Sequence, residues 1–250
     1  MSRWIVSLLA VTLTNAGAAE SPTAPVNSSR ECVFVLHGLA RGTRSMSRLS
    51  AKLSAAGYVV YNLDYPSTRR SFPEMVSALA RAVDTHRAGC SKVHFVAYSL
   101  GALVVRGYLA EASLPELGRV VMIAPPNHGS QIADSFGNSR LFGSLMGTVA
   151  AQLGTSPDKL PNQLPPPQYS LGIIAGDRSI NPLGWLLIPD AHDGSVSVAS
   201  TRLDGMSDFL LVHRSHTFIM NAPEVANETI SFLRHGNFEH RTAFQPQSVP

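Results

Sequence analysis

One stretch in the middle of the chain limits the possible folds most strongly: residues 93–106, which read VHFVAYSLGALVVR. Residues 93–97 form a short apolar run with the composition of a strand, and residues 100–110 are rich in helix formers and contain no proline. Ser99 stands between the two. The pattern predicts a strand that turns sharply into a helix at a serine. The alternative is an ordinary strand–loop–helix connection in which the serine caps the helix.

A sharp strand-to-helix turn at a serine has a chemical use. It presents the hydroxyl of Ser99 at the carboxyl edge of a sheet and directs the N-terminus of the helix toward it. The amide of Leu100 then lies where an oxyanion would form. The run Ala97-Tyr98-Ser99-Leu100-Gly101 departs from Gly-x-Ser-x-Gly only at its first position, where alanine is the smallest change. We therefore predict Ser99 as a catalytic nucleophile.

The rest of the chain alternates between apolar runs and helical patterns, which predicts an α/β fold. Strands are expected at residues 33–36, 58–63, 93–97, 119–123, 170–176 and 208–212, and helices at 46–56, 72–86, 100–110 and 223–233. This alternation implies a mostly parallel sheet of roughly six strands, covered by helices on both faces. Residues 131–167 are rich in Gly, Ser and Pro and form a small cap segment, which is either a mobile lid or a fixed wall.

The first nineteen residues have the features of a signal peptide. Arg3 is followed by an apolar stretch at residues 4–13 and by small residues at 16–18. We expect an exported protein, periplasmic or secreted, with an uncleaved membrane anchor as the alternative. The domain limits are as follows: signal peptide 1–19, linker 20–31, main domain 32–236 and tail 237–250. The net charge is only +3 and no run of Lys or Arg stands out, so no nucleic-acid partner is expected.

A serine hydroxyl becomes a good nucleophile when a histidine takes its proton and a carboxylate orients that histidine. In folds with such a strand–serine–helix turn, the acid follows the serine in the sequence and the histidine follows the acid. His216 comes just after the last expected strand and is the preferred base, with His213 as its rival. Asp177, directly after the fifth strand, and Asp193, in an Asp-Gly turn, are the two candidate acids.

The oxyanion of a tetrahedral intermediate needs a second amide donor. The loop after the first expected strand, His37-Gly38-Leu39-Ala40, is its expected source. Gly38 lets the backbone turn close to the site. The amide of Leu39 is the first candidate and that of Ala40 the second.

The two cysteines of the chain, Cys32 and Cys90, each stand just before an expected strand. If these two strands are neighbours, the thiols can meet at one edge and form a disulfide, which suits an exported protein. The alternative is two unrelated buried thiols.

Together these motifs resemble the α/β-hydrolase superfamily, specifically its small bacterial lipases and esterases, over about residues 32–236. The resemblance rests on five segments: 34–39 (FVLHGL), 97–101 (AYSLG), 125–130 (PPNHGS), 192–196 (HDGSV) and 215–218 (SHTF). In such lipases an Asp-Gly-x-Val segment carries the acid, and the histidine follows a little over twenty residues later. The resemblance therefore favours Asp193 over Asp177.

The resemblance has two further implications. It places the strand before His37 beside the strand before Ser99, which supports pairing of Cys32 with Cys90. It also gives no calcium site, because some lipases use an aspartate two residues after the histidine and this chain has Phe218 there.

The predicted function is hydrolysis of carboxylic esters through an acyl-enzyme. Ser99 attacks, His216 moves the proton, Asp193 orients it, and the amides of Leu39 and Leu100 bind the oxyanion. The expected substrate is a small-molecule or lipid ester, with transient contact at a lipid surface. No cofactor or metal is expected, because no nucleotide, flavin or metal motif occurs. The alternatives are an acyltransferase or amidase on the same triad and a non-catalytic binding member of the fold.

Overall fold

The computed structural model describes residues 30–136, 139, 143–144 and 146–240. The predicted signal peptide, nearly all of the predicted linker and residues 241–250 of the tail lie outside the described residues. So do residues 137–138, 140–142 and 145 of the cap segment. Among the described helices, none has the length and apolar character needed to cross a membrane.

Six strands form the sheet, and each pair of neighbouring strands is parallel. The order across the sheet is β2-β1-β3-β4-β5-β6. The strands are β1 (Glu31–Leu36), β2 (Val59–Leu63), β3 (Lys92–Tyr98), β4 (Leu117–Ile123), β5 (Leu171–Gly176) and β6 (Asp208–Val212). The predicted α/β class and the six-stranded sheet are confirmed.

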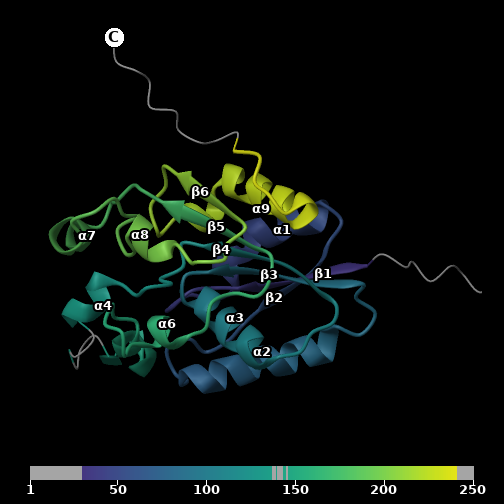
Figure 1. The fold of residues 1–250 in the computed structure, drawn as a ribbon, viewed down its shortest axis with the longest axis horizontal. Helices are drawn as coiled ribbons and strands as arrows, with labels where there is room; N and C mark the ends of the chain where they lie inside the picture. The colour runs from purple at the N-terminus through teal and green to yellow at the C-terminus, as the bar shows by residue number, and fades with distance from the viewer. Residues whose placement is uncertain (1–29, 137–138, 140–142, 145, 241–250) are drawn as a thin grey trace, which may run out of the picture.

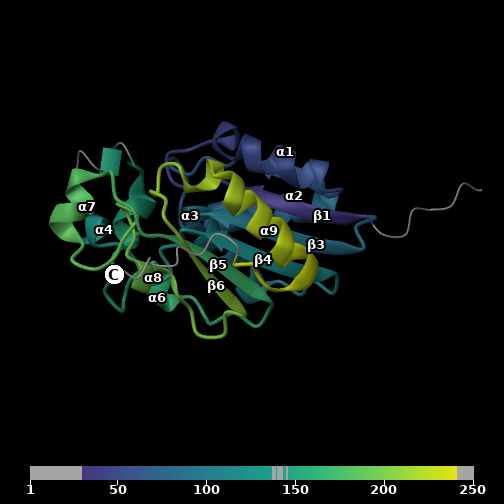
Figure 2. The same cartoon turned by 90° about the horizontal axis from the view of Figure 1, so that it is seen from above.

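Four longer helices cover the two faces of this sheet (Figures 1 and 2). On one face, α1 (Ser47–Ala55), preceded by the 3-10 turn η1 (Thr43–Met46), lies beside α9 (Pro223–His235). On the other face, α2 (Phe72–His86) packs against α3 (Leu100–Glu111). Each face has its own apolar core. Because both faces of the central strands are buried, these strands are nearly continuous apolar runs, which is why they are visible in the sequence.

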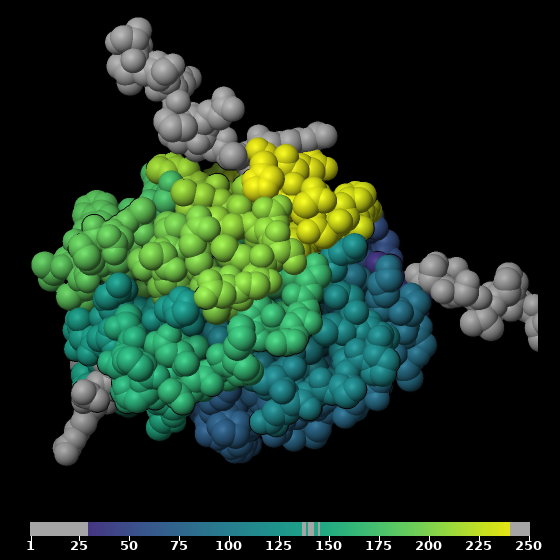
Figure 3. Space-filling model, in the orientation of Figure 1, coloured from purple at the N-terminus to yellow at the C-terminus, as the bar shows by residue number. Residues whose placement is uncertain are grey.

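The short helices gather beyond the carboxyl ends of the strands (Figure 2). They are α4 (Gln131–Phe136), η2 (Thr148–Gln152), α6 (Leu160–Gln163), α7 (Pro182–Leu187), α8 (Val198–Thr201) and η3 (Ile219–Asn221). The segment after β4 and the segment between β5 and β6 lie side by side on the surface (Figure 3), where α4 packs against α7. The sequence does not predict α7 or α8, because each helix is too short to show a helical period.

A disulfide joins Cys32 to Cys90 at the end of the sheet where β1 and β3 begin. The two strands are neighbours, and Cys32 lies opposite Val93 in their register. The Cα atoms of the two cysteines are 5.8 Å apart. The cross-link therefore fixes the amino-terminal edge of the sheet and lies at the opposite end of β3 from Ser99.

Removing this disulfide should weaken the fold without changing the chemistry of the site. The cysteines are 58 residues apart, and opening a loop of this length should lower the free energy of unfolding by about 2–5 kcal/mol. Denaturant unfolding of the Cys32→Ala/Cys90→Ala variant measures this loss. Thiol titration of the denatured, unreduced wild type is the control and should find no free thiol. Two titratable thiols would contradict the prediction.

Candidate active site

Ser99 occupies a strained turn between the end of β3 and the start of α3. Its backbone has φ 53° and ψ −123°, a region that residues other than glycine rarely adopt. The close approach of other chain segments explains the small residues around it. A Cβ atom on Gly101 would lie 2.6 Å from the carbonyl oxygen of His37, so this position requires glycine. Ala97 is fully buried.

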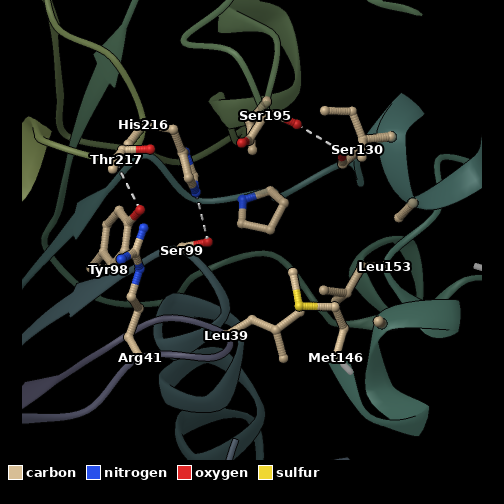
Figure 4. A pocket seen from close by; sticks show the side chains of 15 residues that line it. Leu39, Arg41, Tyr98, Ser99, Ser130, Met146, Leu153, Ser195, His216 and Thr217 are labelled. Carbon is tan, nitrogen blue, oxygen red and sulfur yellow. Dashed lines mark hydrogen bonds between the residues drawn. The ribbon is translucent and has the colours of Figure 1, made fainter. Parts of the chain in front are cut away.

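Three side chains from separate segments meet at this turn. His216 Nε2 lies 3.1 Å from Ser99 Oγ, as Figure 4 shows, and His216 Nδ1 lies 2.6 Å from Asp193 Oδ2. Because a carboxylate only accepts hydrogen bonds, Nδ1 is the donor to Asp193, and Nε2 is left to accept the hydroxyl proton of Ser99. The side chain of Asp193 is fully buried. Its Oδ1 accepts hydrogen bonds from the amides of Ser195 and Val196 at 2.9 and 2.8 Å.

The rival residues pair with each other instead. His213 Nδ1 lies 2.9 Å from Asp177 Oδ1, and 60% of the His213 side chain is exposed. Neither side chain lines the cavity over Ser99. The structure thus brings Asp193 and His216 to Ser99 and keeps Asp177 and His213 together outside the cavity.

Tyr98 holds the main chain of His216 in place. The Tyr98 hydroxyl donates a 2.7 Å hydrogen bond to the carbonyl oxygen of His216, and the two rings lie 5.1 Å apart. Burial raises the pKa of Tyr98 well above its usual range, so the hydroxyl keeps its proton and acts as a donor. The sequence does not predict this role of Tyr98, because the Gly-x-Ser-x-Gly motif leaves the residue before the serine unspecified.

The two candidate loop amides for an oxyanion differ in their partners. The Ala40 amide donates to Ser67 Oγ at 3.1 Å, whereas no described residue accepts a hydrogen bond from the amide of Leu39. Leu100 is the first residue of α3, where amides have no acceptor within the helix. The loop is held by Tyr65, whose hydroxyl donates to the carbonyl oxygen of His37 at 2.5 Å. The amides of Leu39 and Leu100 therefore have no acceptor among the described residues, whereas the amide of Ala40 has one.

A cavity of about 200 Å³ opens over Ser99. One part of its wall is apolar and comes mainly from the loop after β1 and from the segment after β4: Leu39, Pro126, Ile132, Ala133, Met146, Ala150 and Leu153. The other part is polar and includes Arg41, Tyr98, Ser130, Ser195 and Thr217. In Figure 4, Arg41, Tyr98 and Thr217 lie on one side of Ser99, and Leu39, Met146 and Leu153 lie on the other. The cavity thus offers an apolar surface to one part of a ligand and polar groups to another.

Arg106, on α3, anchors the far end of the cap segment. Its buried guanidinium donates hydrogen bonds to the carbonyl oxygens of Asn127, Pro161, Leu164 and Pro165. Burial lowers the pKa of Arg106 to about 10, which leaves it charged at neutral pH. The carbonyl groups therefore compensate a buried positive charge, and this end of the cap segment is tied to the helix that begins at Ser99.

In the part of the chain that the structure describes, no three His, Cys, Asp or Glu side chains are grouped closely enough to bind a metal ion.

A parallel sheet that presents a serine, a histidine and an aspartate at its carboxyl edge is the arrangement of enzymes with a nucleophile elbow. The chain belongs to the alpha/beta hydrolase family, whose sequence model matches residues 33–227. This match confirms the resemblance on which the sequence analysis relied.

Individual relatives are more distant. A triacylglycerol lipase of Pseudomonas fragi is 37% identical over 70 residues, which span 28% of this chain and 24% of the lipase. The mature lipase BlEst2 of Bacillus licheniformis has a similar structure, with a TM-score of 0.60 and 18% identity over 80% of this chain and 90% of that one. Phospholipase PlaB of Legionella pneumophila has a TM-score of 0.65 and 17% identity over 84% of this chain and 60% of that one. At sequence identities of 17–18%, the similarity to these two structures shows a shared fold.

Proposed function

We propose that this protein hydrolyses carboxylic esters through an acyl-enzyme, with Ser99 as nucleophile, His216 as base and Asp193 as orienting acid. The observation that carries the proposal is the continuous chain of hydrogen bonds from Asp193 through His216 to Ser99. It ends at a strained serine turn beneath a cavity with an apolar wall. The lipases among its relatives support an ester as the substrate.

The proposed reaction follows from the positions of these atoms. His216 Nε2 takes the hydroxyl proton as Ser99 Oγ attacks the carbonyl carbon of the ester. The amides of Leu39 and Leu100 bind the negative oxygen of the tetrahedral intermediate. When the intermediate collapses, the bond to the alcohol oxygen breaks and His216 gives this oxygen its proton. Water then attacks the acyl-enzyme by the same steps and releases the acid and free Ser99.

The buried carboxylate of Asp193 has two effects in this scheme. Its bond to Nδ1 fixes the tautomer and the orientation of the imidazole, and its charge stabilises the imidazolium that forms during both steps. Two backbone amides hold the carboxylate itself, so it is already in position before substrate binds.

Release of p-nitrophenol from p-nitrophenyl esters of increasing acyl length tests the proposal. We expect a burst of p-nitrophenol that approaches one equivalent per protein, followed by steady turnover, because acylation by an activated p-nitrophenyl ester should be faster than deacylation. Adding a short alcohol or amine, or replacing the ester by an anilide, distinguishes hydrolysis from acyl transfer and amide cleavage. A protein that hydrolyses none of the esters would instead be a non-catalytic member of the family.

The described parts of the cap segment favour a fixed wall over a mobile lid. Ser130 and Leu153 are joined by a backbone hydrogen bond, Asp134 binds Thr155 through its side chain, and Arg106 anchors the end of the segment. Val149 is fully buried and belongs to the apolar core that also contains residues of α2 and α3. We therefore propose that residues 148–165 remain in place during catalysis.

A fixed wall predicts that the rate of ester hydrolysis follows the concentration of monomeric substrate smoothly through the micellar transition. Proteolysis within residues 148–165 should be no faster in detergent than in buffer. Both measurements use the wild-type protein, with a short-chain ester that forms no micelles as the control substrate. A sharp rise in rate as micelles form, together with faster cleavage in this segment, would identify a mobile lid.

A further inference from the structure

An arginine lines the cavity without a partner for its charge. Arg41 directly follows the loop that carries the Leu39 amide, its side chain is exposed, and it lines the same cavity as Ser99 and His216. It forms no hydrogen bond or ion pair with any described residue. Since a guanidinium can donate five hydrogen bonds, the cavity holds a strong donor that the protein itself does not use.

Arg41 and the apolar wall lie on different sides of Ser99, so together they can orient a substrate that has one polar and one apolar part. Arg41 lies with Tyr98 and Thr217 on one side of Ser99, whereas Met146 and Leu153 lie on the other (Figure 4). The charge of Arg41 also acts on the hydroxyl of Tyr98. Burial raises the pKa of Tyr98, and the positive charge of Arg41 partly offsets this rise. Arg41 is therefore close enough to act on groups beside the main chain of His216, to which Tyr98 is bonded.

The proposed reaction assigns the two sides of the cavity to the two parts of an ester. His216 must reach the alcohol oxygen to give it a proton, so the alcohol part of the substrate lies beside His216 and its neighbour Thr217, on the Arg41 side. The acyl chain then lies along Met146 and Leu153, where burial of its methylene groups is favourable. A negative group on the alcohol part would thus meet the unpaired guanidinium.

We propose that Arg41 forms a subsite for an oxyanion group, a phosphate or a carboxylate, carried by the alcohol part of the ester. This inference rests on the proposed ester hydrolysis and adds a substrate class to it. Arginine suits the role because its planar guanidinium binds the two oxygens of such a group at once.

Two substrates with the same acyl chain test the subsite: 1-hexanoylglycerol, which is neutral, and 1-hexanoylglycerol 3-phosphate, both kept monomeric. The measured quantity is the ratio of kcat/KM for the anionic ester to kcat/KM for the neutral ester. We expect a ratio of about 10 or more for the wild type, the size of effect given by hydrogen bonds to a charged group. In Arg41→Gln the ratio should fall to about 1, and Arg41→Lys should lie between the two, because lysine cannot form the paired contact.

Arg44→Gln is the matched control. Arg44 is exposed, lies in η1 shortly after Arg41 and does not line the cavity. The substitution changes the net charge by the same amount, so the ratio should keep its wild-type value. Equal losses of the ratio in the Arg41 and Arg44 variants would show a general effect of charge and would overturn the subsite.

The remaining outcomes separate the subsite from the chemistry. A wild type that hydrolyses the neutral ester but prefers neither the phosphate ester nor the carboxylate ester overturns the subsite and leaves the proposed function in place. Failure to hydrolyse either ester overturns the proposed function as well. Two further measurements show which anionic group the subsite binds. The first is kcat/KM for the hexanoyl ester of glycolate, which carries a carboxylate. The second is inhibition by free glycerol 3-phosphate, which carries the phosphate but lacks the acyl chain. Preference for either anionic ester, lost in Arg41→Gln, supports the subsite.

Discussion

Replacing Ser99 with alanine should reduce ester hydrolysis by roughly 10⁴–10⁶-fold, the size of loss seen when the nucleophile of a serine triad is removed. The physical reason is that the Oγ atom is the attacking group and that His216 Nε2 has no other hydroxyl at hydrogen-bond distance among the described residues. The fold should be unaffected, because the hydroxyl faces the cavity and makes no other described hydrogen bond. Steady-state rates and circular dichroism on the purified variant measure the two effects.

A fluorophosphonate probe makes this prediction specific to one residue. It should label the wild type on Ser99 and leave the Ser99→Ala variant unlabelled. Ser91→Ala is the matched control, because Ser91 is exposed just before the amino end of the same strand. This variant should keep both its activity and its labelling. If the Ser99→Ala protein is still labelled and turns over at the normal rate, another residue is the nucleophile.

Replacing Asp193 with asparagine should lower kcat by about 10⁴-fold, as loss of the orienting carboxylate does in other triads. An asparagine side chain removes the charge that stabilises the imidazolium. It can also present an N–H group to His216 Nδ1, which would favour the wrong tautomer. The buried position of Asp193 strengthens both effects because water cannot replace the lost carboxylate.

Asp177→Asn is the comparison that decides between the two acids. The Asp177 carboxylate binds the exposed His213, outside the cavity, so its loss should change kcat by less than about tenfold, because this pair does not contact Ser99 or His216. The kcat values of Asp193→Asn and Asp177→Asn are measured with the same substrate at the same pH. The opposite ranking of the two variants would identify Asp177 as the acid.

Most of the sheet could be predicted from the sequence because burial on both faces leaves a clear signal. The central strands β1, β3, β4 and β5 are dominated by buried residues, so they appear as nearly continuous apolar runs. The short helices α7 and α8 could not be predicted. The side chains of Asn181 and Ser197, each just before one of these helices, cap them, and such caps resemble ordinary turns when no apolar period follows.

The candidate site could be predicted only in part. The residues alone left Asp177 and Asp193 both open, since each follows β5 and precedes His216, and only the resemblance to lipases favoured Asp193. Tyr98 and Arg41 could not be predicted from the sequence. Their roles depend on the contacts that bring Tyr98 to the main chain of His216 and Arg41 to the cavity wall, and these contacts join segments that are distant in sequence.

The strained turn at Ser99 has a consequence for how this protein can become more heat-resistant. Ala40 and Ala124 share its positive φ, at 52° and 48°, and each follows the end of a strand, at the same edge of the sheet as Ser99. Relaxing the backbone at the active serine would raise stability but move the nucleophile, a conflict between stability and activity. Substitutions that raise the melting temperature without loss of activity should therefore be found mainly at the amino-terminal edge of the sheet. There the disulfide between Cys32 and Cys90 already joins β1 to the chain before β3.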